Sequence, residues 1–286
     1  MKIKNCLKKT DNPSLSFEVF PPKNSSNFES VLSAAEKIAS LEPTFMSVTY
    51  GAGGGTSEYT LSVASDIQAL GVTAIAHLTC VGATADSIEQ KLASAEKSGI
   101  ENILALRGDL PEEYREGEFR HASDLIKFIK SRGDFCVGGA CYPEGHPESQ
   151  NQKHDIENLK LKESAGCDFM TSQMFFDNNI FYNFMYKVRD AGIKVPIIAG
   201  IMPVTNSKQI ARICKLSGTY LPGKFRQIVD RFGDNQKAMS QAGIAYATEQ
   251  IIDLFANGIN AVHVYSMNNP DVARNIMKNI SDILGK

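Results

Sequence analysis

The chain has 286 residues, with 30 Lys and Arg against 32 Asp and Glu, and its formal net charge is −2. This balance gives no electrostatic reason to expect a nucleic acid or an anionic membrane surface as a partner. A hydrophobic fraction of 43% and a charged fraction of 22% are typical of a globular protein. The length fits two average domains or one large barrel.

The sequence carries no pattern for secretion or for crossing a membrane. Its basic N-terminus, residues 1–10, is followed by no apolar segment of a signal peptide. The longest mostly apolar run, residues 195–204, is far shorter than the roughly 20 residues of a membrane helix. The 6 cysteines have no CxxC or zinc-ligand spacing, so we expect reduced structural thiols in a cytoplasmic protein.

Strand-like and helix-like segments alternate along the chain. Eight apolar, β-branched segments predict strands at residues 15–20, 45–50, 73–79, 102–107, 135–142, 168–173, 195–202 and 261–267. Segments of helical periodicity lie between them at residues 28–41, 57–70, 85–98, 124–131, 154–165, 180–191 and 244–257. Several of these segments end at a glycine, as helices commonly do.

The spacing of the strands predicts the fold. Their starts advance by about 30 residues, the size of one βα unit. Eight such units close into a (βα)8 TIM barrel of the α/β class. The gap before the last strand holds two extra helical segments, 205–216 and 222–231, which we interpret as an insertion between strands 7 and 8. The alternative, an open doubly wound sheet, would more often show a glycine fingerprint after its first strand, where this chain has Pro21 and Pro22.

Polar or ionisable residues lie at or just after the carboxyl ends of nearly all the predicted strands. In barrel enzymes the chemistry lies at the carboxyl ends of the strands, where the βα loops meet. The residues at these positions are Glu18, Thr49, Tyr50, His77, Arg107, Asp109, Tyr142, His146, Gln173, Tyr265 and Ser266. The sequence therefore predicts one polar rim around the mouth of the barrel.

Glu18 is the most informative of these residues. The period of two places Leu15, Phe17 and Val19 on one face of the first strand and Glu18 on the other. If the apolar face packs against helices, Glu18 points into the barrel mouth, where desolvation raises the pKa of a carboxyl and suits it to general acid catalysis. An internal ion pair with an arginine such as Arg107 is the structural alternative.

Residues 107–109, Arg-Gly-Asp, come directly after the largely apolar run 102–106, so the two charges mark the rim. Gly108 would let the backbone approach a ligand, while Arg107 could hold a phosphate and Asp109 could face a polar ring edge. A strand-end ion pair is the alternative. The glycine-rich segment 51–56 does not match a dinucleotide fingerprint and has no P-loop lysine, so we interpret it as a βα loop. A supporting role beside a bound ligand is the alternative.

The histidines do not form a metal motif. His77 and His146 lie beside the rim, but neither has a second His or Cys at ligand spacing, so we expect no bound metal. His263 falls inside the last strand and is interpreted as a packed, hydrogen-bonded residue outside the site. A metal-dependent barrel lyase or hydrolase using His77, Asp109 and His146 stays open as an alternative.

Seven segments on successive strands resemble the bacterial 5,10-methylenetetrahydrofolate reductase family. They are FEVFPP (17–22), SVTYGA (47–52), AHLTC (76–80), ALRGDLP (105–111), YPEGHPE (142–148), QMFFD (173–177) and GIMPV (200–204). The resemblance runs from about residue 12 to the C-terminus. It implies a single catalytic barrel over residues 1–286, without the C-terminal regulatory domain of eukaryotic relatives, and a homo-oligomer.

The resemblance also implies the reaction and its cofactor. A hydride would pass from NADH or NADPH to FAD and then, in a ping-pong sequence, to methylenetetrahydrofolate, giving 5-methyltetrahydrofolate for methionine synthesis. Glu18 would protonate N10 of the folate, and Asp109 would lie near the flavin and the pterin. The residues matching the family's FAD contacts are Tyr50, His77, Arg107, Gly108, Asp109, His121, Ala122, Tyr142, His146, Asp155, Asn158 and Lys162. Thr49, Gln173 and Gln209 match substrate positions.

Three positions depart from the family pattern. Asn269 stands where an arginine often meets the folate glutamate tail, Ile213 where a phenylalanine lies near the aminobenzoyl group, and Leu161 where an arginine lies beside the flavin. Arg274 is a candidate replacement for the tail contact. A non-catalytic flavin-binding barrel is the alternative function, although such a protein would not need Glu18.

Overall fold

The protein is an eight-stranded parallel barrel. The computed structural model describes residues 1–8, 12–22, 24–50, 58–110 and 117–286, with the backbone alone described at positions 58, 209 and 211. The strands close in the order of the chain, β1 to β8. They are β1 (Ser14–Val19), β2 (Met46–Val48), β3 (Ala74–Thr79), β4 (Asn102–Leu106), β5 (Cys136–Cys141), β6 (Phe169–Ser172), β7 (Ile197–Ile201) and β8 (Ala261–Val264). Every predicted strand is confirmed, and so is the (βα)8 fold.

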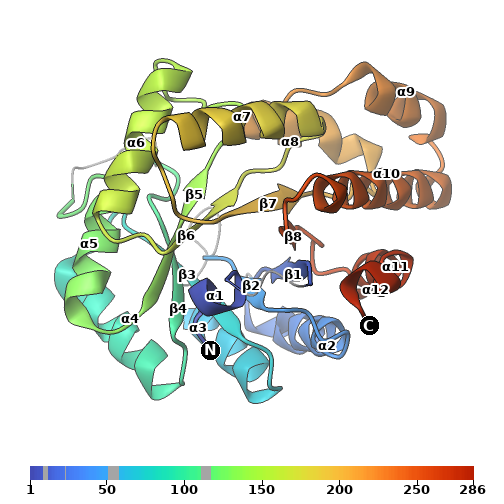
Figure 1. Cartoon of the computed structure of the whole chain (residues 1–286). Coiled ribbons are helices and arrows are strands. Elements are labelled where there is room, and N and C mark those ends of the chain that lie inside the picture. The colour runs from blue at the N-terminus through green and yellow to red at the C-terminus, as the bar shows by residue number, and fades with distance from the viewer. Residues whose placement is uncertain (9–11, 23, 51–57, 111–116) are drawn as a thin grey trace.

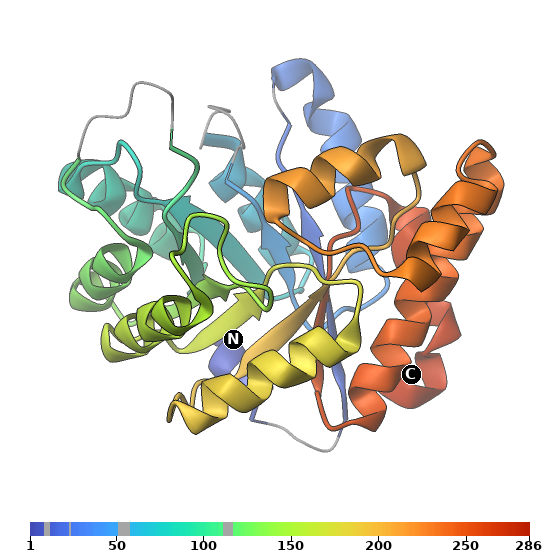
Figure 2. The same ribbon diagram turned by 90° about the horizontal axis from the view of Figure 1, so that it is seen from above.

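Helices surround the barrel on all sides (Figure 1). They are α1 (Ile3–Cys6), η1 (Ser25–Asn27), α2 (Phe28–Ala39), α3 (Glu58–Ala69), α4 (Ala85–Lys97), α5 (Ala122–Arg132), α6 (Gln152–Ser164), α7 (Asn178–Asp190), α8 (Ser207–Ser217), α9 (Gly223–Phe232), α10 (Gln236–Ala256), α11 (Pro270–Asn279) and α12 (Ser281–Leu284). The predicted insertion is confirmed, because α8 and α9 precede α10 between β7 and β8 (Figure 2). Helix α10 begins earlier than predicted, since the Asn235 side chain caps it by accepting from the N–H groups of Lys237 and Ala238.

The short helix α1 was not predicted. It crosses the barrel beside the amino ends of the strands (Figure 1), and Ile3 packs into the interior cluster that contains Phe45, Leu104 and Phe169. The Asn102 side chain fixes it there, accepting from the N–H of Ile3 at 2.9 Å and donating to the Met1 carbonyl at 3.0 Å. The amino-terminal end of the barrel is therefore packed with side chains, and the functional cavities must lie at the opposite end.

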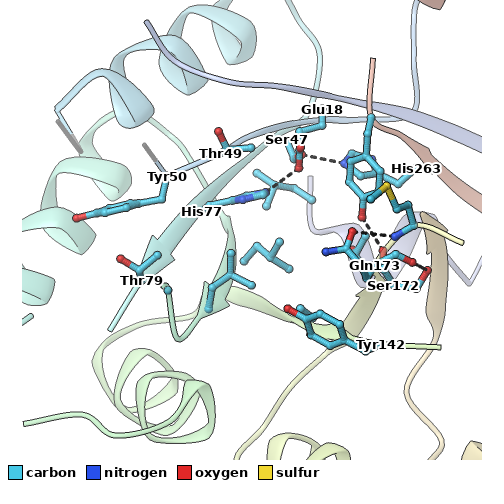
Figure 3. A pocket seen from close by; sticks show the side chains of 18 of the residues that line it. Glu18, Ser47, Thr49, Tyr50, His77, Thr79, Tyr142, Ser172, Gln173 and His263 are labelled. Carbon is cyan, nitrogen blue, oxygen red and sulfur yellow. Dashed lines mark hydrogen bonds and ion pairs between the residues drawn. The ribbon is translucent and has the colours of Figure 1, made fainter. Parts of the chain in front are cut away.

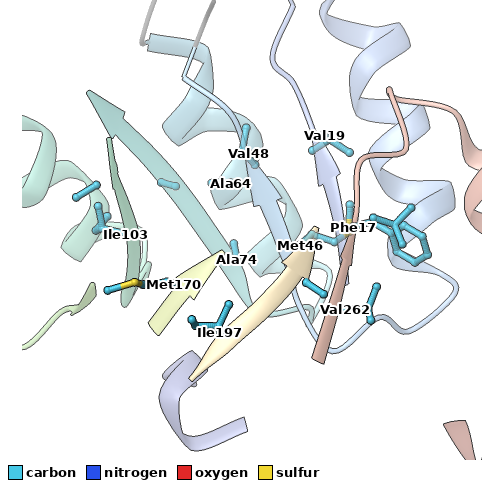
Figure 4. Packing of buried hydrophobic residues seen from close by; sticks show 14 of the residues in the cluster. Phe17, Val19, Met46, Val48, Ala64, Ala74, Ile103, Met170, Ile197 and Val262 are labelled. Carbon is cyan, nitrogen blue, oxygen red and sulfur yellow. The ribbon is translucent and has the colours of Figure 1, made fainter. Parts of the chain in front are cut away.

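The alternation of side chains along the strands separates two apolar layers. Outward-facing residues such as Phe17, Met46 and Val262 pack against the helices (Figure 4). Inward-facing residues at the amino ends, such as Phe45, Ile75 and Phe169, fill the barrel interior. The outward layer includes Leu15, Phe17 and Val19 of β1, which confirms the predicted outward face of that strand.

Candidate functional site

A cavity of about 870 Å³ opens at the carboxyl ends of the strands. Figure 3 shows polar side chains from several strands directed into it. The predicted site residues that line it are Glu18, Thr49, Tyr50, His77, Gly108, Asp109, Tyr142 and Gln173. The fold therefore brings together residues that lie as much as 155 positions apart in the sequence, from Glu18 to Gln173.

A second cavity, of about 800 Å³, adjoins the first. The two share a wall that includes Gly108, Asp109, Tyr142 and Gln173. The predicted cofactor residues that line the second cavity are Arg107, Gly108, Asp109, His121, Ala122, Tyr142, His146, Asp155, Asn158 and Lys162. Asp109, exposed at the junction, can therefore face a ligand in either cavity.

Glu18 enters the first cavity from β1, and its side chain is only 20% exposed. Burial raises the pKa of this carboxyl to about 8, so the group holds its proton at neutral pH. The alternative, an ion pair of Glu18 with Arg107, is wrong: the Arg107 guanidinium pairs with Glu148. Glu18 is thus placed and protonated as a general acid requires.

His77, on β3, lies beside Glu18 in the first cavity. Its Nε2 lies 3.8 Å from Glu18 Oε2, and this buried nitrogen has no hydrogen-bond partner. Burial lowers the pKa of the imidazole to about 3, so the ring is neutral at pH 7. An unpartnered polar atom buried beside a cavity is the kind of group that a ligand satisfies.

His263, excluded from the predicted site, is a packed and hydrogen-bonded histidine as expected, and it also lines the first cavity. Ser16 Oγ donates to the Val262 carbonyl and lies 2.7 Å from His263 Nδ1, so it must accept the Nδ1 proton. The remaining ring nitrogen, Nε2, therefore accepts from Ser47 Oγ at 2.9 Å. These bonds place the proton of the neutral His263 imidazole on Nδ1. His263 lies one layer deeper in the barrel than Glu18, because it pairs with Ser16 in the β1–β8 ladder.

Arg107 is held at the mouth of the second cavity by Glu148. The two guanidinium NH groups donate to the two carboxylate oxygens at 2.6 and 2.7 Å, a bidentate pair. The pair raises the pKa of Arg107 and lowers the pKa of Glu148. Sequence reasoning missed Glu148, although it closes the YPEGHPE segment that carries His146.

One face of α6 supplies three groups to the second cavity. Asp155, Asn158 and Lys162 follow one another at helical spacing and all line it. Lys162 Nζ donates to the Ala140 carbonyl at 2.7 Å. Asp155 is 5% exposed, and its Oδ2 has no hydrogen-bond partner. The N-terminus of α5, with His121 and Ala122, meets the same cavity and favours an anion there.

Of the residues that depart from the family pattern, Ile213 and Leu161 line the cavities, whereas Asn269 does not. Ile213 lies in the wall shared by the two cavities, and Leu161, 58% exposed, lines the second. Asn269 caps α11 by accepting from the N–H groups of Asp271 and Val272, and Arg274 forms an ion pair with Asp271. Neither Asn269 nor Arg274 is among the described residues that line the two cavities.

Two predicted features lie outside the described residues. One is the glycine-rich segment 51–56, and the other is the side chain of Gln209, whose backbone belongs to α8. The aromatic pair after β6 is described, and it serves packing: Phe175 stacks on Phe181, and Phe176 stacks on Phe225. Sequence reasoning also missed Ser47, Thr79 and Met267 as lining residues. Ser47 could have been found, because it lies in β2 two positions before Thr49 and so on the same face of the predicted strand.

The described parts of the chain contain neither a cluster of metal ligands nor a membrane-spanning helix. Within them, no three His, Cys, Asp or Glu side chains are grouped closely enough to hold a metal ion. His77, Asp109 and His146 are all described, so they do not provide the ligand set that a metal-dependent lyase or hydrolase would need. None of the helices in these parts is both long and apolar enough to span a bilayer.

Comparison with known proteins identifies the family. The methylenetetrahydrofolate reductase family model matches residues 2–281. The chain belongs to this family. The 5,10-methylenetetrahydrofolate reductase of Escherichia coli is 35% identical over 260 residues, which cover 91% of this chain and 88% of that protein. The predicted resemblance is thereby confirmed.

Longer relatives align with the same barrel. Methylenetetrahydrofolate reductase (NADH) 1 of Arabidopsis thaliana is 36% identical over 93% of this chain, which spans 48% of that protein. The chain thus spans about half the length of the plant relatives it matches. An uncharacterised protein from Clostridium thermocellum, described as binding two copies of 5-methyltetrahydrofolic acid, covers 99% of this chain with a TM-score of 0.74. At 14% identity, that likeness concerns the fold alone.

Proposed function

We propose that this protein is an FAD-dependent methylenetetrahydrofolate reductase that oxidises NADH or NADPH and reduces 5,10-methylenetetrahydrofolate to 5-methyltetrahydrofolate. The proposal depends on one observation: in a barrel of this family, the Glu18 carboxyl is protonated and points into the first of the two adjoining cavities. A barrel that only bound a flavin would not need this acid. NADH is favoured as the donor because the Arabidopsis relative is a methylenetetrahydrofolate reductase (NADH).

The residues of the second cavity fit FAD. Asp155 offers a buried carboxylate oxygen that has no partner, as a ribose hydroxyl requires. Arg107, Lys162 and the N-terminus of α5 offer positive charge for a diphosphate. His77, at the first cavity, offers an unpartnered ring nitrogen to the heterocycle. When bound, FAD accepts a hydride from one substrate and delivers it to the other.

Glu18 supplies the proton of the folate half-reaction. Its carboxyl donates to N10 of the bridged folate, so that the five-membered ring opens and the one-carbon unit becomes an acceptor for hydride. The pKa of about 8 keeps the acid protonated at neutral pH without making it too weak to donate. Because oxidation of the nicotinamide requires no such proton, Glu18 serves only the second half-reaction.

The remaining polar groups orient the substrates, which bind in turn at the first cavity. The Gln173 carboxamide oxygen accepts from the N–H of Met174 at 2.9 Å, which leaves its amino group directed into the cavity (Figure 3). Such an amide suits the polar edge of a pterin or a nicotinamide. Asp109 lies where the cavities join, and its negative charge beside a reduced flavin would favour release of hydride. Thr49 adds a hydroxyl to the lining of the first cavity.

The absorption spectrum of the purified protein tests this function. We expect a yellow protein that bleaches on anaerobic addition of NADH and regains its colour on addition of methylenetetrahydrofolate. A colourless protein that cannot be reconstituted with FAD would refute the proposal. A yellow protein that bleaches but is not reoxidised by the folate would instead support the flavin-binding alternative.

A further inference from the structure

The end of β1 that carries Glu18 extends beyond its neighbouring strand β8. In the β1–β8 ladder the last aligned pair is Phe17 with Val264, where β8 ends. Odd-numbered residues of β1 bond toward β2, as shown by the contact of Phe17 N–H with the Phe45 carbonyl and of Thr49 N–H with the Val19 carbonyl. Even-numbered residues therefore present their N–H and carbonyl groups to the β8 side.

Beyond the end of β8, side chains from the loop that follows it form hydrogen bonds with the backbone of Glu18 and Phe20. Ser266 Oγ donates to the carbonyl of Glu18 at 3.1 Å. The Asn268 carboxamide binds both backbone groups of Phe20: its Oδ1 accepts from the N–H at 2.9 Å, and its Nδ2 donates to the carbonyl at 2.9 Å. A carboxamide with one donor and one acceptor in this arrangement reproduces what a paired strand would offer.

The loop adopts an unusual backbone to make these contacts. Met267 and Asn268 both have positive φ, 55° and 53°, among only three non-glycine residues of the described chain that do. Asparagine tolerates this left-handed conformation better than most residues, whereas methionine does not. Such conformations persist where surrounding contacts determine them, and they gather at functional sites. Here the turn also places Met267 in the wall of the first cavity.

We propose that Asn268 is a positioning residue for Glu18: its carboxamide replaces the missing strand partner beyond Glu18 and fixes the backbone from which this acid reaches the folate. The proposal rests on the proposed function. Phe20 is the last residue before Pro21 and Pro22, which have no N–H groups. Without Asn268, the described contacts left at this end of β1 are the bonds of Val19 toward β2 and the Ser266 contact with the Glu18 carbonyl, and neither of them holds Phe20.

This arrangement explains why β8 ends early. If β8 continued as a regular strand, its backbone would pair with Glu18 and Phe20, but the chain could not turn to bring Met267 over the cavity. Side-chain pairing by Ser266 and Asn268 secures β1 and leaves the loop free to form one wall of the substrate cavity. The same loop thus fixes the acid and shapes the space in front of it.

Hydrogen exchange in the protein without cofactor or substrate tests the contact directly. The Phe20 amide should exchange roughly tenfold faster in Asn268→Ala than in the wild type, because its only acceptor in the described structure is Asn268 Oδ1. Asn257→Ala is the matched control, since Asn257 Nδ2 also donates to a carbonyl, that of Asp253, at the far end of α10. Unchanged Phe20 exchange in Asn268→Ala would overturn the proposal.

The two half-reactions then test the consequence. Asn268→Ala should lower the rate constant for folate reduction about tenfold or more while the rate of flavin reduction by NADH stays within about twofold of wild type. The KM for the folate should change less than kcat, because the acid and not the binding surface is displaced. Equal losses in both half-reactions would contradict a role through Glu18 and indicate a general structural effect.

Asn268→Gly separates the hydrogen bonds from the backbone strain. Glycine adopts the positive φ at no cost but cannot bind Phe20, so this variant should be as slow as Asn268→Ala in folate reduction. Recovery of the wild-type rate by glycine would show that backbone conformation alone matters, and it would overturn the proposal. If wild-type protein itself fails to reduce the folate, the proposed function fails, whereas the exchange result at Phe20 still decides whether Asn268 fixes this segment.

Discussion

The carboxyl of Glu18 and the imidazole of His77 lie 3.8 Å apart, yet at neutral pH neither carries a charge. Burial raises the pKa of Glu18 to about 8 and lowers the pKa of His77 to about 3. In the barrel interior the proton therefore stays on the Glu18 carboxyl, and Glu18 and His77 do not form an ion pair. Opposite shifts of neighbouring titratable groups are a pattern of acid–base sites, because each environment sets which group donates.

Glu18→Gln should separate the two half-reactions. We expect reduction of the flavin by NADH to stay within about threefold of wild type, while folate reduction falls by about 10²-fold to 10⁴-fold, the usual contribution of a general acid. Stopped-flow absorbance of each half-reaction measures this. Glu29→Gln, at the start of α2, is the control for a change of charge. Equal loss in both half-reactions would contradict the assigned role.

The pH dependence of folate reduction should report the same proton. Because Glu18 acts in its protonated form, the rate should be constant below its pKa of about 8 and fall tenfold per pH unit above it. Flavin reduction by NADH should show no such decrease between pH 7 and 9. Parallel profiles for the two half-reactions would exclude Glu18 as the titrating group.

The buried carboxyl should also cost stability at alkaline pH. Its pKa in the folded chain is raised above the ordinary value of 4.5, so the folded state binds more protons and loses stability as pH rises between 4.5 and about 8. Glu18→Gln removes this loss. We expect it to raise the free energy of unfolding by ~1–3 kcal/mol at pH 9 and to change it little at pH 5. Denaturant titrations at both pH values measure the difference.

The fold was largely predictable from the sequence because its signals are local. Strand-like runs and helical periodicity recur with each βα unit, and the alternation of Leu15, Phe17 and Val19 already directed Glu18 inward. Helix α1 was missed because a helix of 4 residues has no amphipathic period to detect. Its place depends on Asn102, almost one hundred residues away, which no local pattern reveals.

The site was predictable in part for the same reason. Residues at strand ends could be found by position, since the topology gathers them at one rim. Glu148 and Asn268 lie in loops, and their roles arise from contacts with Arg107 and Phe20 that only the folded chain creates. Chain topology thus predicts which residues meet at the rim, while the pairing among them depends on tertiary geometry.

Glu148→Gln should strengthen FAD binding. The Glu148 carboxylate occupies both ends of the Arg107 guanidinium, so an FAD diphosphate must compete with it for this cation. Because the Glu148 side chain is 54% exposed, the pair is worth only ~0.2–1 kcal/mol, which corresponds to at most about a fivefold lower Kd for FAD. Fluorescence titration of the apoprotein measures the Kd. Glu249→Gln, which breaks the exposed pair with Lys224, should leave it unchanged.

Asp155→Asn should change the stability of the apoprotein and its affinity for FAD in opposite directions. Asp155 Oδ2 is buried beside the second cavity without a partner, and burial raises the pKa of this carboxyl. A neutral amide of the same shape removes part of the cost of that burial, so the apoprotein should gain about 1 kcal/mol in free energy of unfolding. The amide accepts more weakly from a ribose hydroxyl, so FAD should bind about tenfold less tightly. Asp190→Asn, on the exposed side of α7, is the control, and a loss of both stability and affinity in Asp155→Asn would show that the carboxylate serves the fold and not the cofactor.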